Sequence, residues 1–365
     1  MKILVIQQKM IGDVLVSSII CNNLRKAFPD ATIDYLVNDN TTPVLEGNPN
    51  IDNIILFKKG PQKSFFELLK FAMAIRKKEY DLVIDAYSKL QSWVISFLSG
   101  AKQKISYKKS GRTFIYTDNV PMAEFPQTNL GLAIERRLSL LAPLNLKIEK
   151  EVEPKLFVTE KEKQEAEQLF EKYNVQTNRM TVMISLLGSE EIKTYPLEFM
   201  AELVNFIGEH YDVNILFNYF PKQIDQAKIV FDLCTEKTKS KIYFDLLGGD
   251  LRSFIGIMNR CDIIFGNDGG SINMAKALGK SSFIIFSPWI EKKIWATFED
   301  GIHHTSTHLN DFRPELFKEK SYNDLKKRSL SLYSEFKPGL IIPKLKIFLD
   351  TNLKGQKTDK QLFTK

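Results

Sequence analysis

Cysteine is scarce in this chain, and its scarcity excludes several classes of protein. Three cysteines occur in 365 residues, and no two of them form a CxxC pair. They are Cys21, Cys234 and Cys261. A disulfide-stapled secreted scaffold and a thiolate zinc site are therefore excluded. The count fits a reducing compartment, and we expect a cytoplasmic protein.

Histidine is almost as rare, with four residues in the chain. Three of them, His303, His304 and His308, stand close together in the sequence. A zinc site needs more ligands than this cluster supplies. We therefore expect no bound metal and place these histidines in a surface loop.

Long hydrophobic runs are also missing, since no apolar stretch reaches the ~18 residues of a membrane span. A strand pattern begins at Lys2 and leaves no room for a signal peptide. We expect a protein of the cytoplasm that can sit peripherally on the inner face of the cytoplasmic membrane.

Acidic residues are too few to balance the basic ones. The chain has 51 lysines and arginines against 44 acids, a net charge of +7. Residues 59–112 alone carry twelve basic and four acidic side chains. This basic stretch fits either an anionic partner, such as a membrane or an acidic glycolipid, or an ordinary solvated surface. No recognised nucleic-acid-binding motif accompanies it, so we expect no nucleic acid partner.

A regular alternation of strand and helix patterns organises the chain. In the first half we expect strands at 3–6, 32–37, 53–57 and 81–85 and helices at 14–28, 65–78, 89–98 and 130–141. In the second half we expect strands at 181–185, 213–217, 242–244, 262–265 and 282–286 and helices at 160–173, 197–210, 221–233, 251–259 and 271–278. Such alternation predicts parallel sheets with helices on both faces.

A charged, turn-rich segment at residues 147–154 separates the two series. We therefore predict two Rossmann-like, doubly wound α/β domains, residues 1–150 and 155–350, that face each other across a cleft. The polar tail, residues 351–365, is expected to be frayed.

The first strand leads into a helix through a turn that contains Gly12 and Asp13. Such a turn places backbone N–H groups and one carboxylate at the carboxyl edge of a sheet, where α/β proteins bind ligands. One glycine does not make a dinucleotide fingerprint, and no Gly-Lys-Ser/Thr follows. Asp13 could instead take a proton from a substrate hydroxyl, although an aspartate here could also serve only as a helix cap.

Two further loops follow strands of the second half. Asp268-Gly-Gly-Ser271 opens a helix whose free N–H groups suit a diphosphate, although Asp268 could be an ordinary N-cap. Lys193 lies shortly before a proline-led helix and could neutralise a phosphate, although a single surface lysine is usually just solvated.

Five segments in this order resemble glycosyltransferase family 9, the ADP-heptose:lipopolysaccharide heptosyltransferases. They are Gly12-Asp13-Val-Leu, Val83-Ile-Asp85, Ala133-Ile-Glu-Arg136, Lys193-Thr-Tyr-Pro196 and Asn267-Asp-Gly-Gly-Ser-Ile-Asn-Met-Ala275. The likeness covers residues 1 to about 290. It implies the GT-B architecture, with the acceptor on the N-terminal domain and a nucleotide-diphospho-sugar on the C-terminal domain.

The resemblance also assigns roles to single residues. Asp13 becomes the general base and Lys193 a contact to the donor phosphate. The donor-binding set is Gly12, Asp268, Gly269, Gly270, Ser271 and Asn273. No metal or other cofactor is implied, in keeping with the lack of an Asp-x-Asp motif.

Two departures from the family pattern bear on the donor sugar rather than on the fold. The family turn usually reads Asp-Thr/Ser-Gly-x-x-His, whereas this chain has glycine after Asp268 and Asn273 in place of the histidine. The segment that is often Phe-Gly-Pro-Thr is Phe286-Ser-Pro-Trp289.

The predicted function is inverting, metal-independent transfer of a sugar from a nucleotide-diphospho-sugar. An ADP-heptose is the favoured donor, and a lipopolysaccharide-core or lipid-linked saccharide is the favoured acceptor. Two alternatives stay open, a GT-B nucleotide-sugar 2-epimerase and a non-catalytic nucleotide-sugar-binding protein.

Overall fold

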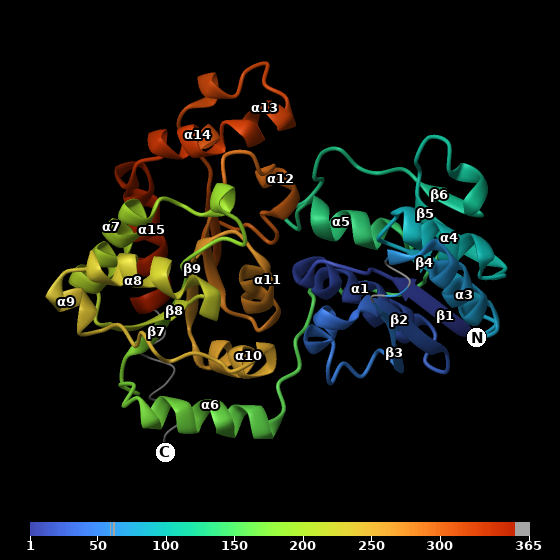
Figure 1. Ribbon diagram of the computed structural model, residues 1–365, viewed down its shortest axis with the longest axis horizontal. Coiled ribbons are helices and arrows are strands. Elements are labelled where there is room, and N and C mark those ends of the chain that lie inside the picture. Colours follow the sequence, from blue (N-terminus) through green and yellow to red (C-terminus); the bar gives the residue numbers. More distant parts are fainter. Residues whose placement is uncertain (59, 61–62, 355–365) are drawn as a thin grey trace. The chain divides into compact units, whose positions relative to one another are not determined.

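The structure is a computed structural model that describes residues 1–58, 60 and 63–354. The chain divides into two compact units. Unit 1 comprises residues 1–157, and unit 2 begins at residue 158. Each unit is an α/β body built on its own parallel sheet (Figure 1).

The sheet of unit 1 has the strand order β3-β2-β1-β4-β5-β6, and all its pairs are parallel. Its strands are β1 Lys2–Ile6, β2 Thr32–Asn38, β3 Asn53–Phe57, β4 Leu82–Asp85, β5 Gln103–Tyr107 and β6 Asp118–Val120. The order reverses between β1 and β4, where Ile6 pairs with Asp85. The loops that follow these two strands therefore flank the topological switch point, the usual ligand site of such a sheet.

The helices of unit 1 cover both faces of its sheet. They are α1 Ile11–Ala27, α3 Phe65–Arg76, α4 Leu90–Leu98 and α5 Leu132–Ser139. Because both faces are covered, β1 is an unbroken apolar run from Ile3 to Ile6, each residue fully buried. Helix α1 begins three residues earlier than expected, so Asp13 lies within its first turn.

Two strands of unit 1 were not predicted. β5 alternates polar and apolar residues, because Gln103, Lys104 and Ser106 interrupt its hydrophobic pattern. β6 has three residues and begins with Asp118. Both lie toward one edge of the sheet, where the requirement for apolar residues is weaker.

The sheet of unit 2 has the order β11-β10-β9-β7-β8, again all parallel. Its strands are β7 Met180–Ser185, β8 Val213–Asn218, β9 Ile263–Asn267, β10 Ser281–Ile285 and β11 His304–Thr307. Its switch point lies between β7 and β9. The loops after these strands carry Lys193 and Asp268, which places both residues at the same edge of the sheet.

The helices of unit 2 surround this sheet and also form the described C-terminal end. They are α6 Glu160–Lys172, α7 Leu197–His210, α8 Ile224–Asp232, α9 Glu236–Lys239, α10 Leu251–Arg260, α11 Gly270–Ala277, α12 Lys292–Trp295, α13 Tyr322–Lys327, α14 Ser329–Glu335 and α15 Pro338–Lys354. One buried cluster joins apolar residues of β7, β9, α7 and α15. Within the described residues, no helix is long and apolar enough to cross a membrane.

Three sequence-based expectations for unit 2 are wrong. Residues 221–223 form a 3-10 turn, and α8 starts only at Ile224. Ile242 makes one isolated bridge to Ile215 rather than belonging to a strand. The frayed tail expected from residue 351 is helical as far as Lys354, because Leu353 packs into the core. The remainder of that tail, 355–365, lies outside the described residues.

Candidate functional site

Asp13 is held by a buried arginine in unit 1. Its Oδ1 lies 2.5 Å from Nη2 of Arg137, a residue of α5. Nε of the same arginine donates to Ser17 Oγ at 3.1 Å, one turn after Asp13 on α1. The N-cap of helix α1 is Met10, and no side chain caps the helix. Asp13 is therefore not a helix cap, and its carboxylate pairs with Arg137 instead. A quarter of the Asp13 side chain stays exposed to solvent.

The pairing with Asp13 stabilises the charged form of Arg137. Burial lowers the pKa of its guanidinium, but the Asp13 carboxylate and two nearby tyrosines outweigh that effect and raise the pKa above its ordinary value. Sequence reasoning missed Arg137, because the segment quoted from its helix ends at Arg136. The available signal was an arginine at the i+4 position from Ala133 on the apolar face of that helix.

Asp85 ends β4 next to the end of β1, but it is fully buried. Its carboxylate accepts hydrogen bonds from the Ser88 backbone N–H at 2.8 Å and from the Tyr116 hydroxyl at 2.6 Å. Burial raises its pKa. Asp85 thus shapes the turn after β4, whereas the Asp13 side chain is partly exposed to solvent.

The turn after β9 and the loop after β7 are joined through Asn267. Its Oδ1 accepts from the Tyr195 backbone N–H at 2.7 Å, and its Nδ2 donates to the carbonyls of Ser185 and Leu186 at 3.1 and 2.8 Å. Gly266 has φ +130° and approaches β7 so closely that a Cβ would lie 2.4 Å from the Ser185 oxygen. These contacts fix the 186–196 loop to the turn that carries Asp268.

Lys193 belongs to the 3-10 turn Glu191–Lys193, which is held in place by three hydrogen bonds to one backbone carbonyl. The backbone oxygen of Ile192 accepts from Ser287 Oγ at 2.7 Å, from Ser329 Oγ at 2.8 Å and from Trp289 Nε1 at 3.0 Å. The Lys193 ammonium lies 5.3 Å from the centre of the Trp289 ring. The preceding loop passes so close that a Cβ on Gly188 would lie 2.5 Å from the Lys193 carbonyl oxygen.

The turn after β9 is open to solvent at Gly269. Gly269, not Asp268, is the N-terminal cap of α11, so the simple capping alternative for Asp268 is wrong. A Cβ on Gly269 would meet no atom within 4 Å, and the backbone there faces open space. Ser271 Oγ lies 3.0 Å from Ser185 Oγ. Asn273 is buried within the helix.

Electrostatics connect Asp268 with two lysines. Burial raises the pKa of Asp268 to about 6, and the charges of Lys193 and Lys276 act against that rise. Lys276 is itself buried, which lowers its pKa to about 8, and its Nζ donates to the Thr297 carbonyl at 2.5 Å. The structure therefore brings Lys193, Asp268 and Ser271 to one edge of unit 2, beside the positive end of α11.

The histidine cluster and Gly12 lie in regular secondary structure or next to it. His304 begins β11 and His308 is buried just after it, so this segment is not a surface loop. Burial lowers the pKa of both imidazoles to about 4, which leaves them uncharged at neutral pH. Gly12 is buried in the first turn of α1 in unit 1, so its predicted donor contact stays a prediction.

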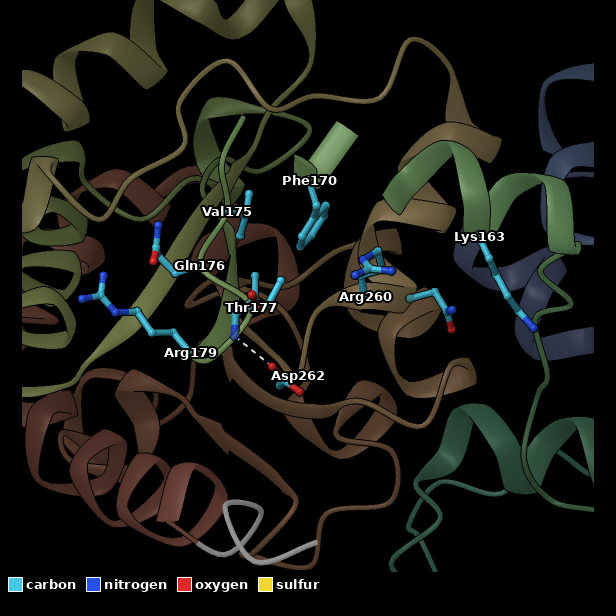
Figure 2. A pocket seen from close by; sticks show the side chains of 10 residues that line it. Lys163, Phe170, Val175, Gln176, Thr177, Arg179, Arg260 and Asp262 are labelled. Atoms are coloured by element: carbon cyan, nitrogen blue, oxygen red, sulfur yellow. Dashed lines mark hydrogen bonds between the residues drawn. The ribbon is translucent and has the colours of Figure 1, made fainter. Parts of the chain in front are cut away.

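A pocket of about 320 Å³ lies at the opposite edge of the unit 2 sheet, around Thr181 and Asp262 (Figure 2). Thr181 N–H donates to Asp262 Oδ2 at 2.8 Å, at the starts of β7 and β9. The three basic side chains that line the pocket each form an ion pair with an acidic residue. The pairs are Lys163–Glu160, Arg179–Asp212 and Arg260–Glu167. Parallel sheets usually bind ligands at their carboxyl ends, and this pocket lies at the other edge, away from Lys193 and Asp268. Among the described residues, no group of three or more His, Cys, Asp or Glu side chains could hold a metal ion.

Known proteins are similar to this chain over most of its length. The family model of glycosyltransferase family 9 (heptosyltransferase) matches residues 68–322, more than half of the chain. Lipopolysaccharide heptosyltransferase 1 of Campylobacter coli is 26% identical over 296 residues, which cover 78% of this chain and 84% of that protein. Lipopolysaccharide heptosyltransferase 2 of Escherichia coli K12 is 23% identical, with coverage of 79% and 83%.

Solved structures agree in fold. A family 9 glycosyltransferase from Veillonella parvula superposes with a TM-score of 0.75 at 18% identity, covering 96% of this chain and 97% of that one. The ADP-heptose lipopolysaccharide heptosyltransferase II of E. coli gives 0.67 at 16% identity, with coverage of 92% and 99%.

Proposed function

The chain belongs to glycosyltransferase family 9 and has a GT-B fold, and from this premise we propose that it transfers a heptose from ADP-heptose to a lipopolysaccharide-core or lipid-linked saccharide. Unit 1 takes the acceptor and unit 2 takes the nucleotide-sugar. The observation that carries the proposal is the exposed Asp13 carboxylate, held by Arg137 at the switch point of the first sheet.

On the acceptor side, Asp13 acts as general base. It removes the proton from an acceptor hydroxyl while that oxygen forms a bond to the anomeric carbon of the donor. Arg137 orients the carboxylate from the buried side and leaves part of it accessible. The bond between the anomeric carbon and the diphosphate breaks in the same step. Attack opposite the leaving group inverts the anomeric configuration.

On the donor side, positive charge meets the departing diphosphate. Lys193 and the N–H groups at the start of α11 provide preorganised donors. The 3-10 turn that carries Lys193 is tied through Ile192 to three other segments, so little rearrangement is needed when charge develops. Asn273 and the glycine after Asp268 bear on the choice of sugar.

This arrangement predicts transfer without a divalent cation. The lysine and the helix N-terminus take the place that a bound metal has in other transferases. Transfer should therefore proceed at an unchanged rate in excess EDTA, and NMR of the product should show inversion at the anomeric carbon. A rate that collapses in EDTA and returns with Mg²⁺ would contradict the metal-free mechanism, and retained configuration would contradict direct displacement.

A lipid-linked acceptor also implies contact with a membrane. The basic stretch 59–112 belongs to unit 1, the proposed acceptor unit. We assign the protein to the cytoplasmic side of the membrane that holds its acceptor.

A further inference from the structure

Two helices of unit 1 expose large apolar side chains on their outer sides. Phe66 on α3 and Leu90 on α4 are 82% and 61% exposed, and Phe97, seven residues after Leu90, is 52% exposed. Phe114, from the loop after β5, is 74% exposed and packs edge to face on Phe97 with ring centres 6.2 Å apart. Met73, seven residues after Phe66, is also exposed.

These side chains form one surface. Helices α3 and α4 lie side by side, and their inner sides pack into the same core through Leu68, Ala72 and Ile95 (Figure 1). A spacing of seven residues returns to the same side of a helix, here the side away from the core. We call the set Phe66, Met73, Leu90, Phe97 and Phe114 the α3–α4 surface.

Exposed basic side chains outnumber exposed acidic ones, Glu67, Glu79 and Asp81, in the segment that carries the α3–α4 surface. The exposed lysines nearest in sequence are Lys63, Lys70, Lys77, Lys78 and Lys89. The Arg112 guanidinium stacks on Trp93, between Leu90 and Phe97 on α4, at 3.6 Å from the ring centre. Contiguous exposed apolar residues bordered by polar ones mark interaction sites. A second copy of this chain would set lysines against lysines, whereas an anionic surface complements both features.

We propose that the α3–α4 surface docks on an anionic bilayer, with its aromatic and aliphatic side chains inserted at the lipid headgroup level. Helices with apolar residues on one side and lysines around them lie in the plane of such an interface. Helices α3 and α4 follow the carboxyl ends of β3 and β4, so Phe66 and Leu90 stand at the sheet edge that also carries Asp13. Docking there presents the acceptor edge to lipid-linked saccharide, a consequence that rests on the proposed function.

The basic stretch as a whole is not the docking surface. Lys102 precedes β5 and Lys108 follows it, so these two lysines lie at opposite edges of the sheet. Lys70, on α3, and Lys77 and Lys78, directly after it, are exposed lysines close in sequence to Phe66 and Met73.

Vesicle co-sedimentation tests this proposal without donor or acceptor. The full chain should bind phosphatidylglycerol vesicles and bind phosphatidylcholine vesicles much more weakly. The triple variant Phe66→Ser, Leu90→Ser, Phe97→Ser should bind at least about tenfold more weakly. Replacing Lys70, Lys77 and Lys78 by Glu should weaken binding by about a hundredfold, since each basic residue contributes to attraction. The matched control is Ile229→Ser, Ile302→Ser, Ile347→Ser, three exposed residues of unit 2, which should bind like the wild type.

Several outcomes would overturn the proposal. One is equal vesicle binding by the wild type and the triple serine variant, and another is equal binding to both lipids. A third is that neither protein binds vesicles while the wild type is a dimer and the serine variant is a monomer. Unfolding temperatures and transfer to a soluble acceptor analogue, both expected to be unchanged, show that the variants are folded. If vesicle binding holds but the wild type transfers no sugar, the proposed function fails and the docking surface stands.

Discussion

Replacing Asp13 by asparagine should lower the rate of heptose transfer by about 10²–10⁴-fold while the affinity for ADP-heptose stays nearly unchanged. Asparagine keeps the shape of the side chain but has no basicity, so the acceptor hydroxyl must lose its proton to water. The proposed donor contacts Lys193 and Asp268–Ser271 lie in unit 2 and are untouched. Single-turnover rates and calorimetric titration with the donor measure the two effects separately.

The ion pair with Arg137 complicates this variant, and the structure suggests how to separate the two roles. Asp13→Asn leaves a buried guanidinium without its counterion, which should destabilise unit 1 by about 3 kcal/mol. The double variant Asp13→Asn, Arg137→Gln removes both charges and should recover most of that stability in urea unfolding. Its transfer rate should stay as low as that of Asp13→Asn. A double variant that regains transfer together with stability would show that Asp13 acts only as a structural partner of Arg137.

Replacing Lys193 by methionine should reduce kcat by about 10²–10³-fold, the usual effect of losing one preorganised group that stabilises developing charge. Methionine keeps the apolar stem against Trp289 but removes the ammonium. Lys326 supplies a matched control, because its Nζ lies 4.8 Å from the centre of the same indole and it is not among the charges that act on Asp268. Steady-state kinetics of both variants should show a large loss for Lys193→Met and little change for Lys326→Met.

The division between kcat and KM decides what Lys193 does. A higher KM with an unchanged kcat would mean that the lysine binds donor and transition state equally well. Equal losses in the two variants would trace the effect to the Trp289 environment instead of to the diphosphate.

Much of the fold was predictable because buried parallel strands must be apolar throughout. The runs Ile3–Ile6 and Val182–Ile184 are apolar throughout and indicate buried strands for that reason. The strands that escaped prediction are polar or short, such as β5 with Gln103 and Lys104. Their pairing is decided by neighbouring strands, which a local pattern does not contain.

The residues around Asp13 in unit 1 and around Lys193 and Asp268 in unit 2 were predictable only in part. Asp13, Lys193 and Asp268 each lie a few residues after the end of a strand, a position that local sequence reveals. Local sequence does not reveal the partners of these residues. Arg137 is 124 residues from Asp13 and contacts it only in the folded unit. The anchoring of Lys193 through the Ile192 carbonyl likewise depends on residues from about 95 to 137 positions away.

The most direct test of the central claim is mass-spectrometric analysis of a reaction containing the purified protein, ADP-heptose and a heptose-deficient lipopolysaccharide core. The account predicts that the acceptor gains the mass of one heptose residue, that ADP is released in equal amount, and that neither change occurs when the acceptor is omitted. Conversion of the nucleotide-sugar without acceptor would indicate an epimerase. Donor binding with no product under any condition would indicate a non-catalytic binding protein, and either result would contradict transfer.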